Sequence, residues 1–270
     1  MQSGKTEVNS TIKDGLKVAG ATGTGGFIVP PRPLNIIVGA FGSGKTEVAV
    51  NWSIALARDG YSVRLADLDV ANPYFRSREA QGELRQNGVE PVIPAGEVQF
   101  SDLPVLIPQI KGMLQRETGD FSFFDVGGDE AGAKVLASLR NAFPNTPYAL
   151  YQVINSRRPF TDSVAGCIEM KKSLERTSGL QITSYIINSH LMSLTTLAVV
   201  AEGITFGEKL EAETGVPVAF VTVMHDAVDV TKLKKIARYP IAEMTRRMLP
   251  PWLTRNASQT WPLSAGDRRG

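Results

Sequence analysis

A glycine-rich run at residues 39–46 has the residue types and the spacing needed to bind phosphate. It matches every specified position of the pattern G-x-x-x-x-G-K-[ST]. Backbone N–H groups of such a loop surround phosphate oxygens, Lys45 can reach the β- and γ-phosphates, and the Thr46 hydroxyl suits Mg²⁺. The residues predicted to bind nucleotide here are Gly39, Ala40, Phe41, Gly42, Ser43, Gly44, Lys45, Thr46 and Glu47.

The segments on either side of this loop favour the same interpretation. The apolar run 34–38 predicts a strand, and the pattern over 45–58 predicts a helix. A strand that passes through a glycine-rich turn into a helix N-terminus is the arrangement that binds phosphate. Residues 3–8 repeat six letters of this region and residues 20–26 are glycine-rich, but neither run directly follows a strand. We therefore predict that residues 1–33 form a flexible leader without a phosphate site.

Carboxylates at the ends of two later strands could supply the other groups that nucleotide hydrolysis needs. Asp67 and Asp69 follow a predicted strand at 61–66, and Asp125 follows another at 121–124. Open α/β sheets bind ligands at the carboxyl ends of their strands. We expect Asp125 to hold Mg²⁺ through water and Asp69 to orient the attacking water, although a turn or helix-capping role is the simpler alternative for each. The predicted catalytic residues are Lys45, Asp69 and Asp125, and the predicted metal ligands are Thr46, Asp67, Asp69 and Asp125.

Predicted strands and helices alternate along the chain. This order indicates an α/β fold in three layers, with a mostly parallel sheet and helices on both faces. We predict one nucleotide-binding domain over 34–250 and a polar tail over 251–270. The predicted strands are 34–38, 61–66, 89–93, 121–124, 148–154, 181–187 and 216–223, and the predicted helices are 45–58, 77–87, 105–118, 131–140, 162–177 and 203–214.

The composition is that of an ordinary globular protein and excludes several classes of function. The chain has 270 residues, 43% of them hydrophobic, and its formal net charge of +2 gives no strong field for nucleic acid or an anionic membrane. Cys167 is the single cysteine, which excludes a disulfide within one chain and a Cys-x-x-Cys metal site. No signal-peptide core and no apolar run near about 18 residues is present, so we expect a cytoplasmic protein without specific nucleic-acid binding.

The order of these motifs resembles the MinD/ParA-type P-loop ATPases. The phosphate loop is followed by an Asp-x-Asp strand end beginning at Asp67, an Asp-x-x-Gly strand end from Asp125 to Gly128, and a strand that ends at Asn188. The backbone N–H of Gly128 can face the γ-phosphate. The resemblance covers about residues 34–226, and the family belongs to a wider class with signal-recognition GTPases, nitrogenase iron protein and dethiobiotin synthetase.

This resemblance implies roles for particular residues and for two ligands, ATP and Mg²⁺. Asp69 would occupy the water-activating position, Asn188 would read the adenine edge, and His225 and Asp226 would flank the base. ATP is preferred over GTP because the sequence has no Asn-Lys-x-Asp guanine signature. Ala40 stands where the family's deviant loops carry a lysine that reaches the partner's nucleotide in a dimer. A different cationic group would therefore have to serve if hydrolysis needs one.

Three basic segments are candidates for such a group or for another anion site. Arg76 and Arg78 follow the Asp-x-Asp strand end and could stabilise the transition state, in the same chain or across a dimer; exposed arginines on a helix are the alternative. Arg157 and Arg158 could clamp the anion of a second substrate, or lie in solvent. Residues 231–255 form a basic amphipathic pattern that suits a membrane surface or a partner, although a helix that covers the sheet is favoured.

Three functions remain open from the sequence. The first is a Mg-ATP-dependent ATPase that switches its interaction with a partner protein or a second copy, with water oriented by Asp69 and a switch over 72–78. The second is an ATP-dependent kinase or ligase of the dethiobiotin or cobyrinate synthetase type, with Arg157, Arg158 and the loop 95–102 binding the acceptor. The third is a nucleotide sensor with negligible hydrolysis.

Overall fold

The computed structural model describes most of the predicted nucleotide-binding domain. The described residues are 26–28, 30, 32–69, 81–92, 120–140 and 147–247. Predictions for residues 1–25, for Arg76 and Arg78, for the loop 95–102, for the helix 105–118 and for the tail 251–270 lie outside the described residues.

A parallel sheet forms the centre of the fold, as predicted. Its eight strands lie in the order β3-β2-β4-β1-β5-β6-β7-β8, and each described pair of neighbours is parallel. The carboxyl ends of all these strands therefore lie at one edge. The strands are β1 (Leu34–Gly39), β2 (Ser62–Asp67), β3 (Val89–Val92), β4 (Asp120–Gly127), β5 (Tyr148–Ile154), β6 (Ser184–Ile187), β7 (Val218–Met224) and β8 (Ile241–Met244).

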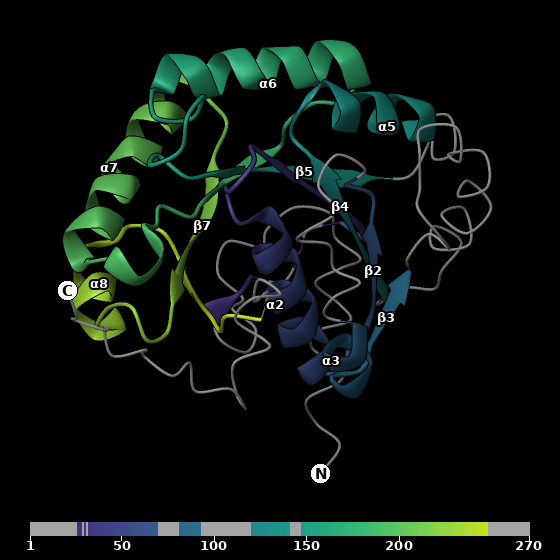
Figure 1. Cartoon of the computed structure of the whole chain (residues 1–270), viewed down its shortest axis with the longest axis horizontal. Helices are drawn as coiled ribbons and strands as arrows, with labels where there is room; N and C mark the ends of the chain where they lie inside the picture. Colours follow the sequence, from purple (N-terminus) through teal and green to yellow (C-terminus); the bar gives the residue numbers. More distant parts are fainter. Residues whose placement is uncertain are drawn as a thin grey trace, which may run out of the picture.

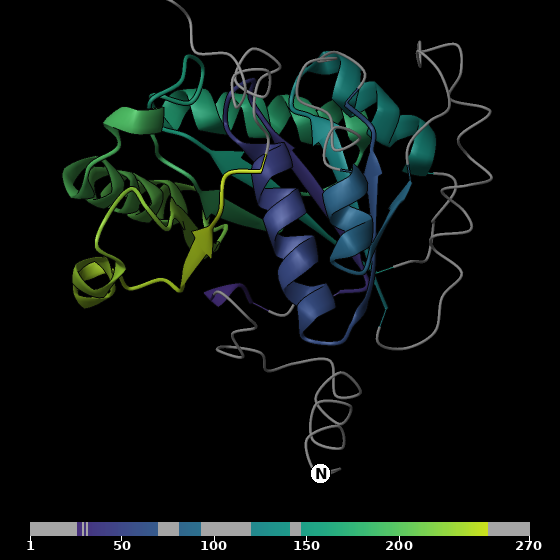
Figure 2. The ribbon, with the colours of Figure 1, turned by 60° about the horizontal axis from the view of Figure 1, so that its bottom comes forward.

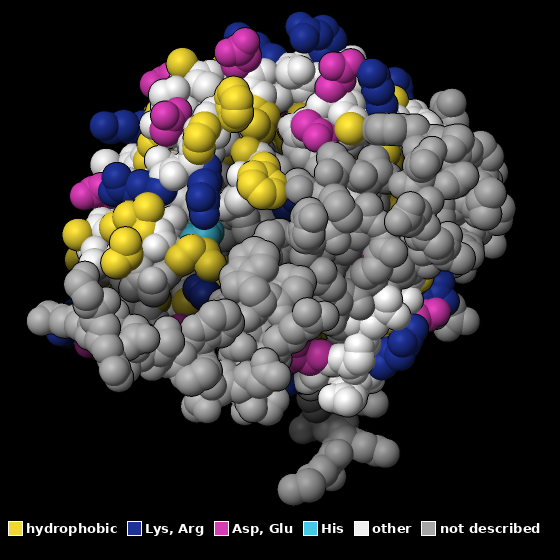
Figure 3. Space-filling model, viewed as in Figure 1, with side chains coloured by type: hydrophobic (Ala, Val, Ile, Leu, Met, Phe, Trp, Pro, Cys, Tyr) yellow, Lys and Arg dark blue, Asp and Glu magenta, His cyan; other side chains and the backbone are white. Residues whose placement is uncertain are grey.

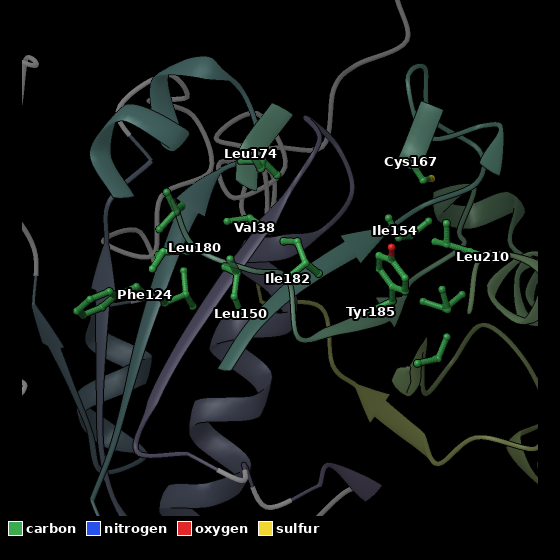
Figure 4. Close-up of a cluster of buried hydrophobic side chains, with 14 of the residues drawn as sticks. Val38, Phe124, Leu150, Ile154, Cys167, Leu174, Leu180, Ile182, Tyr185 and Leu210 are labelled. Atoms are coloured by element: carbon green, nitrogen blue, oxygen red, sulfur yellow. The ribbon is translucent and has the colours of Figure 1, made fainter. Parts of the chain in front are cut away.

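Helices cover both faces of this sheet and bury two hydrophobic clusters. The helices are α2 (Lys45–Arg58), α3 (Gln81–Gln86), α5 (Glu130–Arg140), α6 (Val164–Ser178), α7 (Leu197–Thr214) and α8 (Val230–Ile236), with a 3₁₀ turn at Met192–Leu194. Figures 1 and 2 show α2 and α3 on one side of the sheet, with α5, α6 and α7 on the other. Figure 4 shows part of the cluster that lies between the sheet and helices α5, α6 and α7. In it, Val38 and Leu150 from the strands lie near Leu174 from α6.

The alternation of side chains along two strands decides where the acidic residues go. Residues two positions apart on a strand point to the same face of the sheet. Phe123 on β4 and Leu65 on β2 pack in the cluster on the α2 face. Asp125 and Asp67, two residues further along these strands, therefore point to the α2 face as well. Asp67 and Asp125 are also direct neighbours in the β2–β4 register. The strand ends therefore bring two carboxylates together beneath the start of α2.

The basic stretch 231–255 is not one amphipathic helix, so this expectation was wrong. After α8 the chain passes Pro240, which has no backbone N–H to continue a helix, and then forms β8 beside β7. The apolar residues Leu233, Ile241 and Met244 are buried in the core of the domain. They do not form an exposed apolar face for a membrane, and no helix among the described residues is long and apolar enough to cross one.

Helix α7 begins before its predicted start at Gly203. The Thr196 side chain accepts a hydrogen bond from Val199 N at 3.3 Å and caps a helix that starts at Leu197. Gly203 lies inside that helix because a side chain there would clash with Ser189. A glycine that suggests a helix boundary in the sequence therefore serves close packing instead.

Trp52 fixes α2 to the sheet through a cluster of aromatic rings. Its side chain is fully buried. Its ring stacks on Phe27 at 6.2 Å between centroids and meets Phe123, Tyr151 and Phe220 edge-on at 5.2, 5.1 and 4.9 Å. Because α2 begins at the phosphate loop, this cluster also positions the loop.

Core packing begins before the predicted domain boundary at residue 34. Phe27 is buried in the aromatic cluster, and Trp52 Nε1 donates to the carbonyl oxygen of Ile28 at 2.8 Å. The last part of the predicted leader therefore belongs to the folded domain.

We expect Trp52→Ala to lower the free energy of unfolding by about 3–5 kcal/mol, because it removes a large buried ring and leaves a cavity. Urea denaturation followed by circular dichroism measures this loss. Trp52→Phe is the matched control and should lose clearly less, since it keeps a ring among the other aromatics. Equal stability of the wild type and Trp52→Ala would contradict this role for the cluster.

Candidate nucleotide-binding site

The glycine-rich loop joins β1 to α2 in the geometry that its sequence predicts. Gly42 and Gly44 have φ angles of 74° and 85°, which L-residues with side chains rarely adopt. A side chain at Gly44 would also clash with Asn188, and one at Gly128 would clash with the backbone of Gly39. Three glycines thus allow the loop, β4 and the end of β6 to approach one another closely.

Lys45 is held by carboxylates beneath this loop. Its Nζ lies 2.7 Å from Asp69 Oδ2, and both side chains are more than nine-tenths buried. Burial by itself lowers the pKa of Lys45, but the charges of Asp125, Asp69 and Asp67 outweigh this effect and raise its pKa. The lysine is therefore charged, as phosphate binding requires.

Thr46 and Asp125 form the second link between the loop and the sheet. The Thr46 hydroxyl donates to Asp125 Oδ2 at 2.6 Å. Burial raises the pKa of Asp125 from 3.8 to about 6, with a small contribution from Asp69, while Lys45 and the Thr46 hydrogen bond act in the opposite direction. The other oxygen, Oδ1, is buried and accepts no hydrogen bond from any described residue.

The donor set around Thr46 fits a magnesium ion that shares its ligands with phosphate. A hydroxyl and carboxylates are the hard oxygen ligands that Mg²⁺ takes, and Mg²⁺ usually keeps several waters and phosphate oxygens. In the described part of the chain, no three Asp, Glu, His or Cys side chains converge as a ready metal site. The residues present therefore suit a metal that arrives with a nucleotide.

Two more acidic side chains complete the acidic side of the site. The backbone N–H of Asp69 donates a hydrogen bond to Asp67 Oδ1 at 3.2 Å, which fixes Asp69 next to the end of β2. Asp129, which the sequence reasoning missed, accepts from Gly132 N at 2.9 Å and caps α5. A side chain at Gly127 would contact an oxygen of Asp69 and one of Asp129, so both carboxylates lie at the end of β4.

A pocket of about 240 Å³ continues from the loop toward β6 and β7. The loop residues Phe41, Gly42 and Gly44 and the first turn of α2 form one wall. His225 and Asp226 follow β7 in a turn and do not line this pocket. The other lining residues include Arg158, Asn188, His190, Met192, Met224 and Arg246.

Asn188 links β6 to the phosphate loop. Its Nδ2 donates to the carbonyl oxygen of Ser43 at 2.7 Å, and the side chain is buried. A carbonyl only accepts, so this bond sets the orientation of the amide and leaves Oδ1 as the group that can accept from a ligand.

The two arginines after β5 turn to different partners. Arg157 forms an ion pair with Glu202 on α7, whereas Arg158 Nε donates to Gly42 O at 3.2 Å on the phosphate loop. They do not form a joint clamp. His190, Met192 and Arg246 were missed as pocket residues because nothing in their local sequence marks them.

Comparisons with known proteins find similar structures but no similar sequences. No protein-family model matches the sequence, and no curated protein sequence matches it. Among solved structures, chloroplast FtsY from Physcomitrella patens is 15% identical with a TM-score of 0.50, over 79% of this chain and 66% of that chain. FtsY from Mycoplasma mycoides is 18% identical with a TM-score of 0.51, over 70% and 59%. The signal recognition particle receptor FtsY from Elizabethkingia anophelis, in complex with GDP, is 16% identical with a TM-score of 0.49, over 80% and 63%.

The chain has a P-loop NTPase fold. It spans about two thirds or less of the length of these three proteins. The matches lie in the wider class that the sequence motifs resemble and do not single out the MinD/ParA family within it. At these identities the likeness concerns the fold alone.

Replacing Asp125 with asparagine should stabilise the protein at neutral pH. Because the pKa of Asp125 is raised in the folded state, the unfolded chain ionises first, so stability falls as the pH rises from about 4 to 6 and stays reduced above that. Asp125→Asn removes this loss. Its melting temperature should exceed that of the wild type at about pH 7.5, and the difference should shrink toward about pH 4.

Thermal melts across this pH range provide the measurement. Ser122→Ala, three residues earlier on β4, is a control that should show no such pH-dependent difference. A wild type that is the more stable of the two at neutral pH would contradict the assignment of a raised pKa to Asp125.

Proposed function

We propose that this protein binds Mg-ATP and hydrolyses it to switch its interaction with a protein partner. The observation that carries this proposal is the pairing of Lys45 with Asp69 and of Thr46 with Asp125 beneath one glycine-rich loop. These pairs bring the phosphate-binding cation, the metal-binding hydroxyl and two carboxylates together on a P-loop NTPase fold.

The Lys45–Asp69 pair supports a direct link between phosphate binding and catalysis. When phosphate oxygens take Lys45, the Asp69 carboxylate is released and can accept a hydrogen bond from the attacking water. The water oxygen then bonds to the γ-phosphorus as the bond to the β,γ-bridging oxygen breaks. Mg²⁺, held by Thr46 and Asp125, would neutralise charge on the phosphates.

A preference for adenine over guanine is part of this proposal. Asn188 Oδ1 can accept from the exocyclic amino group of adenine. Recognition of guanine N1–H and its amino group calls for an acidic acceptor. Among the described residues that line the pocket, Glu47 is the one acidic side chain, and its Oε1 already accepts from Asn51 Nδ2 at 3.2 Å and from Arg247 N at 2.6 Å.

Exposed apolar side chains near the loop support a protein partner. Phe41 is 68% exposed on the phosphate loop, and Phe160 is 77% exposed on the neighbouring loop after β5. Phe160 and Met192 also have φ angles of 69° and 55°, a strained conformation that typically costs about 1–3 kcal/mol and persists at functional sites. Figure 3 shows exposed apolar side chains among charged ones on one face of the described surface.

The kinase or ligase alternative loses its main support in this geometry. That alternative places the acceptor at Arg157, Arg158 and the loop 95–102. Arg157 pairs with Glu202 and Arg158 contacts the phosphate loop, and the loop 95–102 lies outside the described residues. The sensor alternative differs from the switch in turnover alone, which can be measured.

Lys45→Ala should weaken Mg-ATP binding by more than about tenfold, because it removes a charge-assisted contact to the phosphates. Isothermal titration with Mg-ATP and Mg-GTP measures this effect, and the wild type should bind Mg-ATP at least about tenfold more tightly than Mg-GTP. Lys134→Ala, on the exposed face of α5, is the matched control. Unchanged affinity in Lys45→Ala would refute the phosphate site, and tighter binding of Mg-GTP would refute the base preference.

Asp69→Ala should retain Mg-ATP binding and lower ATP turnover by about 10²–10⁴-fold, since it removes the group that orients water. Phosphate release by the wild type should rise when the physiological partner is added. A pull-down from native lysate compares Asp69→Ala in Mg-ATP with Lys45→Ala, and a partner captured by the first variant alone supports the switch. Undiminished turnover in Asp69→Ala would remove it from the mechanism.

A further inference from the structure

We propose that Arg158 and Arg246 form a second anion site, which binds a phosphate carried on the ribose of the nucleotide. This inference rests on the proposed function, because it assumes that the 5′-phosphates bind at the glycine-rich loop. The ligand class is a nucleotide that carries a 2′- or 3′-phosphate in addition to its 5′-phosphate chain.

Arg158 enters the pocket from the loop after β5. Its backbone is fixed by two hydrogen bonds, from Arg158 N to Asn155 O at 3.1 Å and from Thr161 N to Arg158 O at 3.2 Å. Its Nε donates to Gly42 O at 3.2 Å, and its terminal amino groups contact no acceptor among the described residues. The guanidinium is therefore held in place with its two terminal nitrogens available to a ligand.

Arg246 enters the same pocket from the segment after β8. The residues on either side of it are fixed to α2: Asn51 exchanges hydrogen bonds of 3.0 Å with Thr245 N and O, and Glu47 Oε1 accepts from Arg247 N at 2.6 Å. Arg246 itself forms no ion pair within the described ranges. The chain thus fixes its backbone closely while its charge has no structural partner.

The two arginines and the catalytic aspartates act on different groups of the site. The charges that act on Lys45 are the three aspartates beneath the loop, whereas those that act on His190 are Arg158 and Arg246. Burial, followed by these two arginines, lowers the pKa of His190 to about 4, so the ring is neutral at physiological pH. The residues that line the pocket include both arginines and none of the three aspartates around Lys45, so the nucleoside would lie on the basic side.

An anion satisfies these two groups better than an uncharged ligand does. Guanidinium groups bind phosphate through paired hydrogen bonds, and two of them near one neutral imidazole match the oxygens of a phosphate. Glu47 lines the same pocket, but its Oε1 already accepts hydrogen bonds from Asn51 Nδ2 and from the backbone N–H of Arg247. The pocket is continuous with the glycine-rich loop, so an anion carried by the nucleotide itself can reach both arginines.

The test compares ADP with adenosine 3′-phosphate 5′-diphosphate and with its 2′-phosphate isomer, by isothermal titration on the full chain. We expect one of the two isomers to bind the wild type at least about tenfold more tightly than ADP. Arg158→Gln and Arg246→Gln should each lose most of this advantage. Arg157→Gln is the matched control, because Arg157 is adjacent in sequence but pairs with Glu202, and it should keep the advantage.

Three results would overturn the proposal. Equal affinity of the wild type for ADP and for both phosphorylated forms would exclude a ribose-phosphate site and leave the proposed function standing. If Arg158→Gln and Arg246→Gln weaken all three ligands by the same factor, the arginines bind the shared adenosine part instead. If the wild type binds none of the three nucleotides, the proposed function fails together with this inference. Melting temperatures of the variants show that each result refers to a folded protein.

Discussion

Lys45 and Asp69 meet at 2.7 Å in a place from which water is almost wholly excluded. Removing one partner of such a pair typically costs about 3–5 kcal/mol, since the other charge is then left buried and uncompensated. Asp125 and Asp67 share this environment, and their charges keep the lysine protonated. The cluster can exist only where several strand ends meet beneath one loop, so it requires the parallel sheet and the order β2-β4-β1.

Helix α2 transmits this constraint to the rest of the domain. Its first turn carries Lys45 and Thr46, and its middle is fixed to the sheet by Trp52 in the aromatic cluster. A third surface of the same helix holds the segment after β8 through Glu47 and Asn51. The phosphate loop, the core and the segment that carries Arg246 are thus parts of one packed unit, and a shift of α2 would move all three.

The sequence allowed the fold class and the acidic half of the site to be predicted, because both are written in local patterns. A glycine-rich loop between a strand and a helix, and aspartates directly after apolar runs, are recognisable without knowledge of the strand order. The basic half of the pocket has no such signal. Arg158 and Arg246 are 88 positions apart in the numbering and meet because β5 and β8 end at the same edge of the sheet.

The sequence predictions fail where contacts between distant segments, and not local patterns, determine the structure. Residues 231–255 show the spacing of an amphipathic helix, yet β8 has just four residues, too few for a two-residue alternation to stand out. Phe27 lies beyond a proline-rich stretch that suggests a break, and its burial depends on a contact with Trp52 that no periodicity reveals. Tertiary contacts decide both cases.

The distribution of charge also implies a direction for a bound nucleotide. The N-terminus of α2 favours an anion through its partial positive charge, and Lys45 lies in its first turn, next to the three carboxylates. A metal-bound phosphate end is favoured on that acidic side, where a divalent cation offsets the negative charge. The basic side, with Arg158 and Arg246, would repel the same cation and attract negative charge on the ligand. The aspartates around Lys45 and the arginines around His190 would therefore favour a single orientation of a bound nucleotide, with the metal at the aspartates and the nucleoside toward His190.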